Sequence, residues 1–236
     1  MSETNRARIE RHTALENGSA IAIDGPVASG KTTVGRSLAH RLKYRFLDTG
    51  GMYRAVTVAA LSEDVDLNDP DVLTMLAENM RIDVVTKPDG DLLLVNDLDV
   101  TDKLRDRAVD QNVSQVSAVR GDRVALVNQQ RKIGEQGSIV MVGRDIGTVV
   151  LPDAGAKVFL DASVEVRANR RFLQAQKDNG TLTYQNILDD LVKRDQIDSE
   201  RAESPLVPAE DALILDTKNL TIEQVVELIL NELRNR

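Results

Sequence analysis

Short apolar runs alternate with amphipathic segments along most of the chain. The apolar runs lie at Ser19–Asp24, Tyr44–Leu47, Ser138–Val142, Lys157–Asp161 and Ala212–Leu215. Continuous apolar runs of this length are typical of strands that are buried on both faces of a parallel sheet. The segments between them have helical periodicity, and parallel strands are joined through such helices by right-handed crossovers. The pattern therefore predicts an α/β protein with a five-stranded parallel sheet flanked by helices.

A different pattern interrupts this alternation between residues 70 and 114. Asp69 and Pro70 have the residue types of a helix N-cap and a first helical position. The other elements expected nearby are β-like runs at Arg81–Thr86 and Asp91–Asn96, a turn at Lys87–Gly90, and helices near Thr101–Asn112 and Gln115–Lys132. We therefore expect residues 70–114 to form an α+β insert, after which the chain returns to the main sheet.

A glycine-bounded segment follows the first predicted strand, and it matches G-x-x-x-x-G-K-[ST] at every fixed position. In such a loop backbone N–H groups point at phosphate oxygens, the lysine reaches the β/γ-phosphates, and the threonine hydroxyl ligates Mg²⁺. A chance glycine-rich turn is the alternative, but strand, loop and helix occur in the required order. We expect a nucleoside triphosphate to be bound by Gly25, Pro26, Val27, Ala28, Ser29, Gly30, Lys31, Thr32 and Thr33.

The charge and composition of the chain limit which kinds of partner the protein is expected to bind. The 236-residue chain has a net charge of -8 and no cysteine. An acidic balance argues against general binding of nucleic acid or of a membrane surface, and no apolar run approaches the roughly 18 residues of a membrane span. The lack of cysteine excludes disulfides and fits a reducing compartment. We expect a cytoplasmic monomer that acts on small molecules, with residues 1–18 as a flexible N-terminal extension.

Several arginines lie near strand ends or on single helix faces, where they could form a local anion site in this acidic chain. They are Arg54, Arg123, Arg144, Arg194 and Arg201. A guanidinium holds a phosphate with two parallel hydrogen bonds, although a solvated surface charge is the alternative for each arginine taken singly. For Arg144 a role in a binding site is favoured, because this residue directly follows a buried strand. Its neighbour Asp145 pairs with it or caps a turn, or else holds Mg²⁺-bound water or accepts from a base amino group.

A second arginine group occupies one helix face. Arg167, Arg170 and Arg171 are spaced i, i+3 and i+4, and an Asp-Asn-Gly break follows at residues 178–180. The three side chains either form a solvated helix face or belong to a mobile lid that closes over the phosphates. A lid would exclude water, so that the phosphoryl group reaches its acceptor and is not hydrolysed.

Five segments together resemble the bacterial cytidylate kinases. They are Ile23–Lys31, Leu47–Arg54, Gly143–Val150, Phe159–Ser163 and Ser204–Pro208, and the resemblance extends from about Ser19 to the C-terminus. It implies a P-loop kinase fold of the nucleoside monophosphate kinase type, formed by one kinase domain over residues 19–236. The 70–114 insert would then bind the monophosphate, and a small lid would lie at about residues 167–184. The implied reaction is direct in-line transfer of the γ-phosphoryl of ATP to CMP or dCMP with Mg²⁺, in pyrimidine nucleotide metabolism.

The resemblance also implies roles for individual residues. It matches cytosine recognition to Thr49, Ser114, Arg123 and Asp145, phosphate binding to Arg54, Arg144 and Arg201, and contacts near the ribose and phosphates to Arg194 and Asp198. Thr49 departs from the family in that serine also occurs there, but the hydroxyl is retained. Tyr53 follows the same strand end as Thr49 and is expected beside the acceptor. Lys31, Arg144, Asp145 and Arg201 are the expected catalytic residues.

The chemistry of cytosine supports this reading independently. A carboxylate accepts from the amino group at position 4, while an arginine donates to N3 and O2. Uracil presents an acceptor at position 4, which would face Asp145 repulsively. The other readings are a P-loop kinase for another nucleotide or for a metabolite such as shikimate, and a GTPase or ATPase switch. A GTPase should carry Asn-Lys-x-Asp, which this sequence lacks, and a metabolite kinase would not need the insert.

Overall fold

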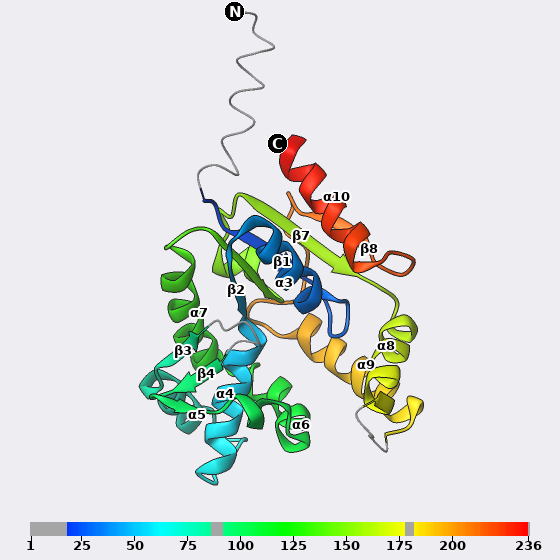
Figure 1. Ribbon diagram of the computed structural model, residues 1–236. Coiled ribbons are helices and arrows are strands. Elements are labelled where there is room, and N and C mark those ends of the chain that lie inside the picture. The colour runs from blue at the N-terminus through cyan, green and yellow to red at the C-terminus, as the bar shows by residue number, and fades with distance from the viewer. Residues whose placement is uncertain (1–17, 86–91, 178–181, 236) are drawn as a thin grey trace, which may run out of the picture.

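The structure is a computed structural model, and it describes residues 18–85, 92–177 and 182–235 (Figure 1). The predicted turn at Lys87–Gly90 and the predicted break at residues 178–180 lie outside the described residues, as does nearly all of the N-terminal extension.

Five parallel strands form the main sheet, in the order β2-β6-β1-β7-β8. The strands are β1 (Ile21–Asp24), β2 (Arg45–Asp48), β6 (Ile139–Gly143), β7 (Ala156–Asp161) and β8 (Leu213–Asp216). In the register, Ile21 of β1 is paired with Val140 of β6 and with Ala156 of β7, so β1 is the central strand. The predicted parallel sheet is confirmed, with strand ends shifted by one or two residues.

Both faces of the sheet are covered, because alternate residues of each strand enter different apolar clusters. Ile21 and Ile23 pack with α3 (Lys31–Leu42) and α10 (Ile222–Asn235). Ala22 points the other way and joins a cluster with α4 (Thr49–Ser62) and α7 (Arg120–Gly134). Burial on both sides explains why the strands are continuously apolar.

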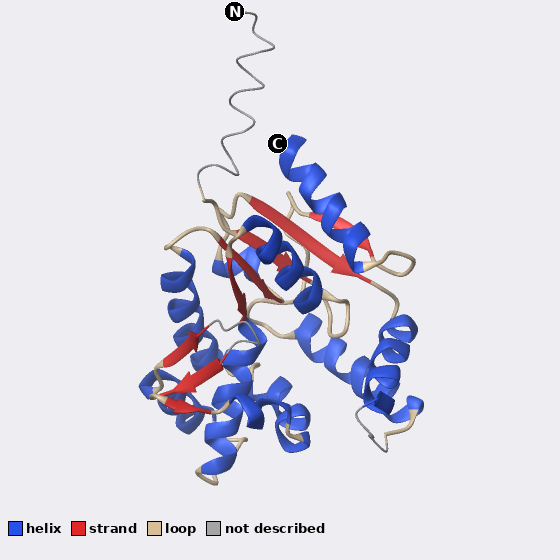
Figure 2. Cartoon of the chain, viewed as in Figure 1, coloured by secondary structure: helices blue, strands red, loops and turns tan. Residues whose placement is uncertain are grey.

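A small antiparallel sheet lies within the predicted insert (Figure 2). Its strands are β3 (Ile82–Val85), β4 (Leu92–Val95) and β5 (Leu98–Asp99), and they follow helix α5 (Pro70–Asn79). Asp69 accepts hydrogen bonds from the backbone N–H groups of Asp71 and Val72, which confirms the predicted N-cap. Strand β5 was not predicted. It follows a turn in which Asn96 and Asp97 both have positive φ, at 48° and 68°, as a tight hairpin requires.

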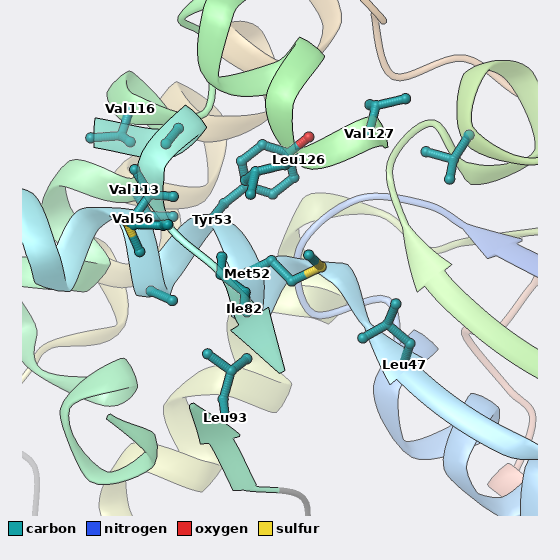
Figure 3. Packing of buried hydrophobic residues seen from close by; sticks show 14 of the residues in the cluster. Leu47, Met52, Tyr53, Val56, Ile82, Leu93, Val113, Val116, Leu126 and Val127 are labelled. Carbon is teal, nitrogen blue, oxygen red and sulfur yellow. The ribbon is translucent and has the colours of Figure 1, made fainter. Parts of the chain in front are cut away.

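The small sheet shares its core with the main body. Figure 3 shows Ile82 of β3 and Leu93 of β4 beside Met52, which belongs to α4. Val113 and Leu126, from the two following helices, join the same cluster. The small sheet is therefore held against the main body by a continuous apolar cluster.

The helices after the small sheet begin and end at other residues than predicted. The expected helix at Thr101–Asn112 is a 3-10 segment, Thr101–Arg105, followed by α6 (Arg107–Val116). The prediction of a break near residues 113–114 was wrong, because the chain turns at residues 117–119 instead. Local contacts stabilise that turn: the Arg123 Nη1 donates to the Ser117 carbonyl at 3.2 Å. The Ser117 hydroxyl also donates to the Ser114 carbonyl at 3.0 Å.

Helices α8 (Val164–Lys177) and α9 (Tyr184–Glu200) pack against each other next to the carboxyl ends of the strands. A π-helical turn at Ile146–Val150 follows β6 and was not predicted. Over the residues that the structure describes, we find no helix that is both long enough and apolar enough to cross a membrane.

Candidate active site

The loop between β1 and α3 has a backbone that only glycine permits at its start. Gly25 has a φ of 145°, and a Cβ there would lie 2.1 Å from the Leu160 carbonyl oxygen. Gly30, with a φ of 99°, is the N-cap of α3. The loop and the start of α3 line a cavity of about 630 Å³, with the backbone N–H groups and positive end of a helix available to an anion.

Lys31 is buried at the start of α3, and its Nζ donates to the Pro26 carbonyl at 2.7 Å. Burial, and then the charge of Arg144, hold the pKa of Lys31 well below its ordinary value. A phosphate group near Nζ would oppose both effects by favouring the charged form of the lysine. The position therefore suits an ammonium group whose counter-ion is a ligand.

Thr32 and Asp48 lie together at the mouth of the loop. The Thr32 hydroxyl donates to Oδ2 of Asp48 at 2.7 Å, and Oδ1 of Asp48 accepts from the Gly50 backbone N–H at 3.0 Å. Asp48 is the N-cap of α4, which begins at Thr49. A hydroxyl and a carboxylate are the hard oxygen ligands that Mg²⁺ prefers.

Asp24, at the end of the central strand, orders the loop after β6. Its two carboxylate oxygens accept from the backbone N–H groups of Ile146 and Gly147, each at 2.8 Å. Burial raises the pKa of Asp24 to about 6, although these two hydrogen bonds act in the opposite direction. The bonds connect the end of β1 to the segment that carries Arg144 and Asp145.

A second cavity, of about 700 Å³, adjoins the loop. It is lined by every residue predicted for the acceptor: Thr49, Tyr53, Arg54, Ser114, Arg123, Arg144, Asp145, Arg194, Asp198 and Arg201. These residues come from α4, α6, α7, α9 and the loop after β6. The fold therefore brings the predicted acceptor residues to one cavity.

Arg123 and Asp145 form a buried ion pair in this cavity, and each residue is only 3% exposed. The Arg123 guanidinium also lies over the ring of Tyr53, 5.3 Å from its centroid. Burial raises the pKa of Tyr53 to about 12, so its hydroxyl stays protonated. The pair presents a carboxylate acceptor and a guanidinium donor side by side in a part of the cavity that is largely buried from solvent. Asp145 is therefore paired with Arg123 and not with the adjacent Arg144.

Arg144 instead pairs with Asp198, Nε to Oδ2, at 2.9 Å. Arg201 Nη1 lies 3.7 Å from Oδ1 of the same carboxylate. Burial alone would raise the pKa of Asp198, but Arg144 and Arg201 outweigh it and lower this pKa below its ordinary value. Asp198 is therefore ionised and holds two guanidinium groups at the cavity.

Three guanidinium nitrogens of residues that line this cavity are buried without a hydrogen-bond partner among the described residues. They are Nε of Arg123, Nε of Arg194 and Nη2 of Arg201. Burial, followed by repulsion from Arg144 and Arg54, lowers the pKa of Arg194 to about 10. Buried donors without acceptors are costly, so an anion that accepts from them would stabilise the cavity.

The arginines of α8 do not form a uniformly solvated helix face, because Arg167 is buried and Arg170 is half-buried, whereas Arg171 is exposed. Arg167 is buried and forms an ion pair with Asp195, with Nη2 and Oδ2 2.5 Å apart. Arg170 donates to the carbonyl and hydroxyl of Thr217 at 2.6 and 3.0 Å. Arg170 and Arg171 line the smaller cavity, whereas Arg167 supports the loop from behind by donating to the Val27 carbonyl at 3.1 Å.

Sequence reasoning missed Thr217 and Asp110. Thr217 follows the carboxyl end of β8 and lines the smaller cavity, so the rule about strand ends could have identified it. Asp110 lies on α6 and lines the larger cavity. No motif or spacing in the sequence indicates Asp110, because its partners come from distant elements.

Comparisons with known proteins identify the family of the chain. The family model described as cytidylate kinase matches residues 21–235. The cytidylate kinase of Bacillus subtilis (strain 168) is 44% identical over 222 residues, which cover 94% of this chain and 99% of that protein. The cytidylate kinase of Fusobacterium nucleatum is 41% identical over 209 residues, covering 89% of this chain and 94% of that protein.

Among solved structures, shikimate kinase from Bacteroides thetaiotaomicron is 14% identical, with a TM-score of 0.48, over 91% of this chain and 98% of that chain. A likeness at that level carries no information about the substrate. The family match extends over nearly the whole chain, and the identity to the bacterial enzymes is high over the same residues. The chain therefore belongs to the cytidylate kinase family.

Proposed function

We propose that this kinase transfers the γ-phosphoryl group of ATP to the phosphate of CMP or dCMP, giving ADP and CDP or dCDP. The observation that carries the proposal is the pair of adjoining cavities. A triphosphate loop with a buried lysine lines one cavity, and buried guanidinium donors without partners line the other. Two anionic substrates would satisfy these groups, and a phosphoryl group would pass between them.

ATP is proposed to lie along the loop Gly25–Thr33, with Lys31 at its β/γ-phosphates. Thr32 and Asp48 fit Mg²⁺, because a hydroxyl and a carboxylate oxygen lie 2.7 Å apart beside the loop. When bound, Mg²⁺ would neutralise charge on the phosphate oxygens. Asp24, Asp48 and Asp145 are the carboxylates that could order its water ligands, and of these Asp24 is engaged by backbone N–H groups and Asp145 by Arg123. Asp48 is therefore our assignment.

Cytosine is proposed to face Asp145 and Arg123, with Thr49 and Ser114 at its edge. The carboxylate would accept from the amino group, and the guanidinium would donate to N3 and O2. Both side chains are buried and paired, so they are fixed before the base arrives. A uracil base would leave its acceptor at position 4 against the carboxylate.

The acceptor phosphate is proposed to be held by Arg54, Arg144 and Arg201, with Arg194 and Asp198 near the ribose and the phosphates. No protein nucleophile is needed, because an oxygen of the monophosphate attacks the γ-phosphorus in line while the bond to the ADP oxygen breaks. The residues would contribute by orienting the two phosphates and by balancing their charge. Lys31, Arg144, Arg201 and Asp145 are the proposed catalytic residues.

The test is ADP release with ATP and one acceptor at a time, namely CMP, dCMP, UMP, AMP or dTMP. We expect CMP and dCMP to give the highest kcat/KM. If UMP, AMP or dTMP led the series, the assignment of the acceptor would be wrong. Shikimate, added as a further acceptor, tests the reading as a metabolite kinase.

We further propose that the protein acts as a cytoplasmic monomer on small molecules, without binding nucleic acid or membranes. Residues 19–236 would be one kinase domain, with 70–114 as the monophosphate-binding insert and about 167–184 as a small lid. The net charge of -8 argues against binding of nucleic acid and of membrane surfaces, and the lack of cysteine fits a reducing cytoplasm. A molar mass near the chain's 26.0 kDa in light scattering is the expected result for a monomer.

A further inference from the structure

Asp110 connects two arginines that belong to different parts of the site. Its Oδ1 lies 2.6 Å from Nη2 of Arg54, on α4. Its Oδ2 lies 3.0 Å from Nη2 of Arg171, on α8. The carboxylate is therefore shared, one oxygen to each guanidinium, and it bridges α6 to a helix 61 residues further along the chain.

Arg171 occupies a special place between the cavities. Among the arginines in the described part of the chain, it is the one that lines both the smaller cavity at the triphosphate loop and the larger cavity, here called the acceptor cavity. Lys31 lines both as well, so these two cationic side chains lie where the two cavities adjoin. The Arg171 side chain is 43% exposed, whereas that of Arg123 is only 4% exposed, so burial does not hold Arg171 in place as it holds Arg123.

Arg54 has a second anchor, since its Nη1 donates to the Leu104 carbonyl at 2.9 Å. It would keep this contact if Asp110 lost its charge, whereas Arg171 would lose the ion pair that holds it. A guanidinium has five N–H donors, so both arginines retain donors for phosphate while they contact Asp110. The carboxylate also reduces the repulsion between two like charges that it holds close together.

We propose that Asp110 is a positioning residue for phosphoryl transfer, whose carboxylate holds Arg171 at the junction of the two cavities. The proposal rests on the proposed function, because the junction matters only if both substrates bind as described. Asp110 acts through Arg171 and is not itself in contact with the transferred group. Its effect should therefore fall on turnover more than on binding of the acceptor.

The test compares Asp110→Asn with wild type, using ATP and CMP. We expect kcat to fall about tenfold, and KM for CMP to change by less than about threefold, because a misplaced cationic side chain costs transition-state stabilisation. The matched control is Asp106→Asn, which removes an exposed carboxylate at the start of the same helix. The control should keep the wild-type kcat.

A double-mutant cycle separates positioning from a general structural effect. Arg171→Gln alone should lower kcat, and adding Asp110→Asn to it should lower kcat by less than about twofold more, since the two residues act together. Multiplicative losses would overturn the proposal. So would an unchanged kcat in Asp110→Asn, or a lower KM for CMP at unchanged kcat, which would mean that Asp110 only competes with phosphate.

Wild-type turnover keeps the two claims distinct. If wild type does not phosphorylate CMP, the proposed function itself fails. If wild type is active and Asp110→Asn matches it, only the role of Asp110 fails. The thermal unfolding of each variant is measured in parallel. If Asp110→Asn folds poorly, Asp110→Glu serves as the second variant. It keeps the charge, and its kcat should lie between those of Asp110→Asn and wild type.

Discussion

Replacing Asp145 by Asn tests the base-recognition reading most directly. The substitution keeps an oxygen that can accept a hydrogen bond, but it removes the negative charge and adds an NH₂ donor. The new donor would suit the acceptor at position 4 of uracil, which the carboxylate repels. We therefore expect Asp145→Asn to lose preference for CMP over UMP, with UMP gaining relative to CMP.

The magnitude follows from the burial of the pair. Asp145 and Arg123 are each 3% exposed, so a base polar group left unpaired against them is not rescued by water. An unsatisfied buried group costs about 1–3 kcal/mol, which corresponds to a change in selectivity of about tenfold to a hundredfold. Removing one charge of a buried pair also destabilises the fold, by about 3 kcal/mol at the lower end of the usual range.

The assay is kcat/KM for CMP and for UMP with the same preparation of enzyme, so that a loss of folded protein cancels in the ratio. The matched control is Asp122→Asn. Asp122 is also a buried carboxylate and is the sequence neighbour of Arg123, but it lines neither cavity. The control should keep the wild-type ratio. An Asp145→Asn enzyme with an unchanged ratio would exclude Asp145 as the reader of the base.

Three further predictions concern single side chains. Lys31→Ala should lower kcat far more than it raises KM for ATP, since its ammonium acts on the transferring group; a raised KM alone would contradict this. Burial raises the pKa of Asp122 from 3.8 to about 7, so its native state holds a proton that the unfolded chain releases, and stability should fall as pH rises from about 4 to 7. Asp122→Asn should therefore match wild type near pH 4 and exceed it at pH 8 by about 2–4 kcal/mol in urea unfolding, and equal stability at pH 8 would refute the shift. Asp24→Ala leaves the Ile146 and Gly147 N–H groups without their acceptor and should cost about 2–4 kcal/mol of unfolding free energy, whereas a loss below about 1 kcal/mol would mean that water replaces the carboxylate.

Local signals in the sequence accounted for the sheet and for the cavity residues. A triphosphate loop is a continuous stretch of sequence, so its motif can be recognised directly. The carboxyl ends of parallel strands lie at the same edge of the sheet, whatever path the connections between the strands take. This is why Arg144 lines one cavity with Thr49 and Arg54, although it is distant from them in the chain. The helix-borne Arg194 and Arg201 were assigned from spacing and family resemblance, and they line the same cavity.

Contacts between distant segments could not be predicted in the same way. The partner of Arg167 is Asp195, and that of Asp145 is Arg123 and not its neighbour Arg144. Helical periodicity places a side chain on a face, but it does not say which element covers that face. The break between α6 and α7 was misplaced although its stabilising contact is local, because helical periodicity does not show that the buried Arg123 donates to the Ser117 carbonyl.

The balance of guanidinium and carboxylate groups in the acceptor cavity relates these contacts to the proposed reaction. Buried arginines are costly unless each has a counter-ion, and here Asp145 serves Arg123 while Asp198 serves both Arg144 and Arg201. The acceptor cavity therefore holds more guanidinium groups than carboxylates before any substrate binds, in a chain whose net charge is -8. A nucleoside monophosphate brings close to two negative charges, so its phosphate would supply the counter-ions that the fold leaves out. The carboxylates fix where the arginines point, and the deficit of carboxylates would favour a phosphate in the cavity.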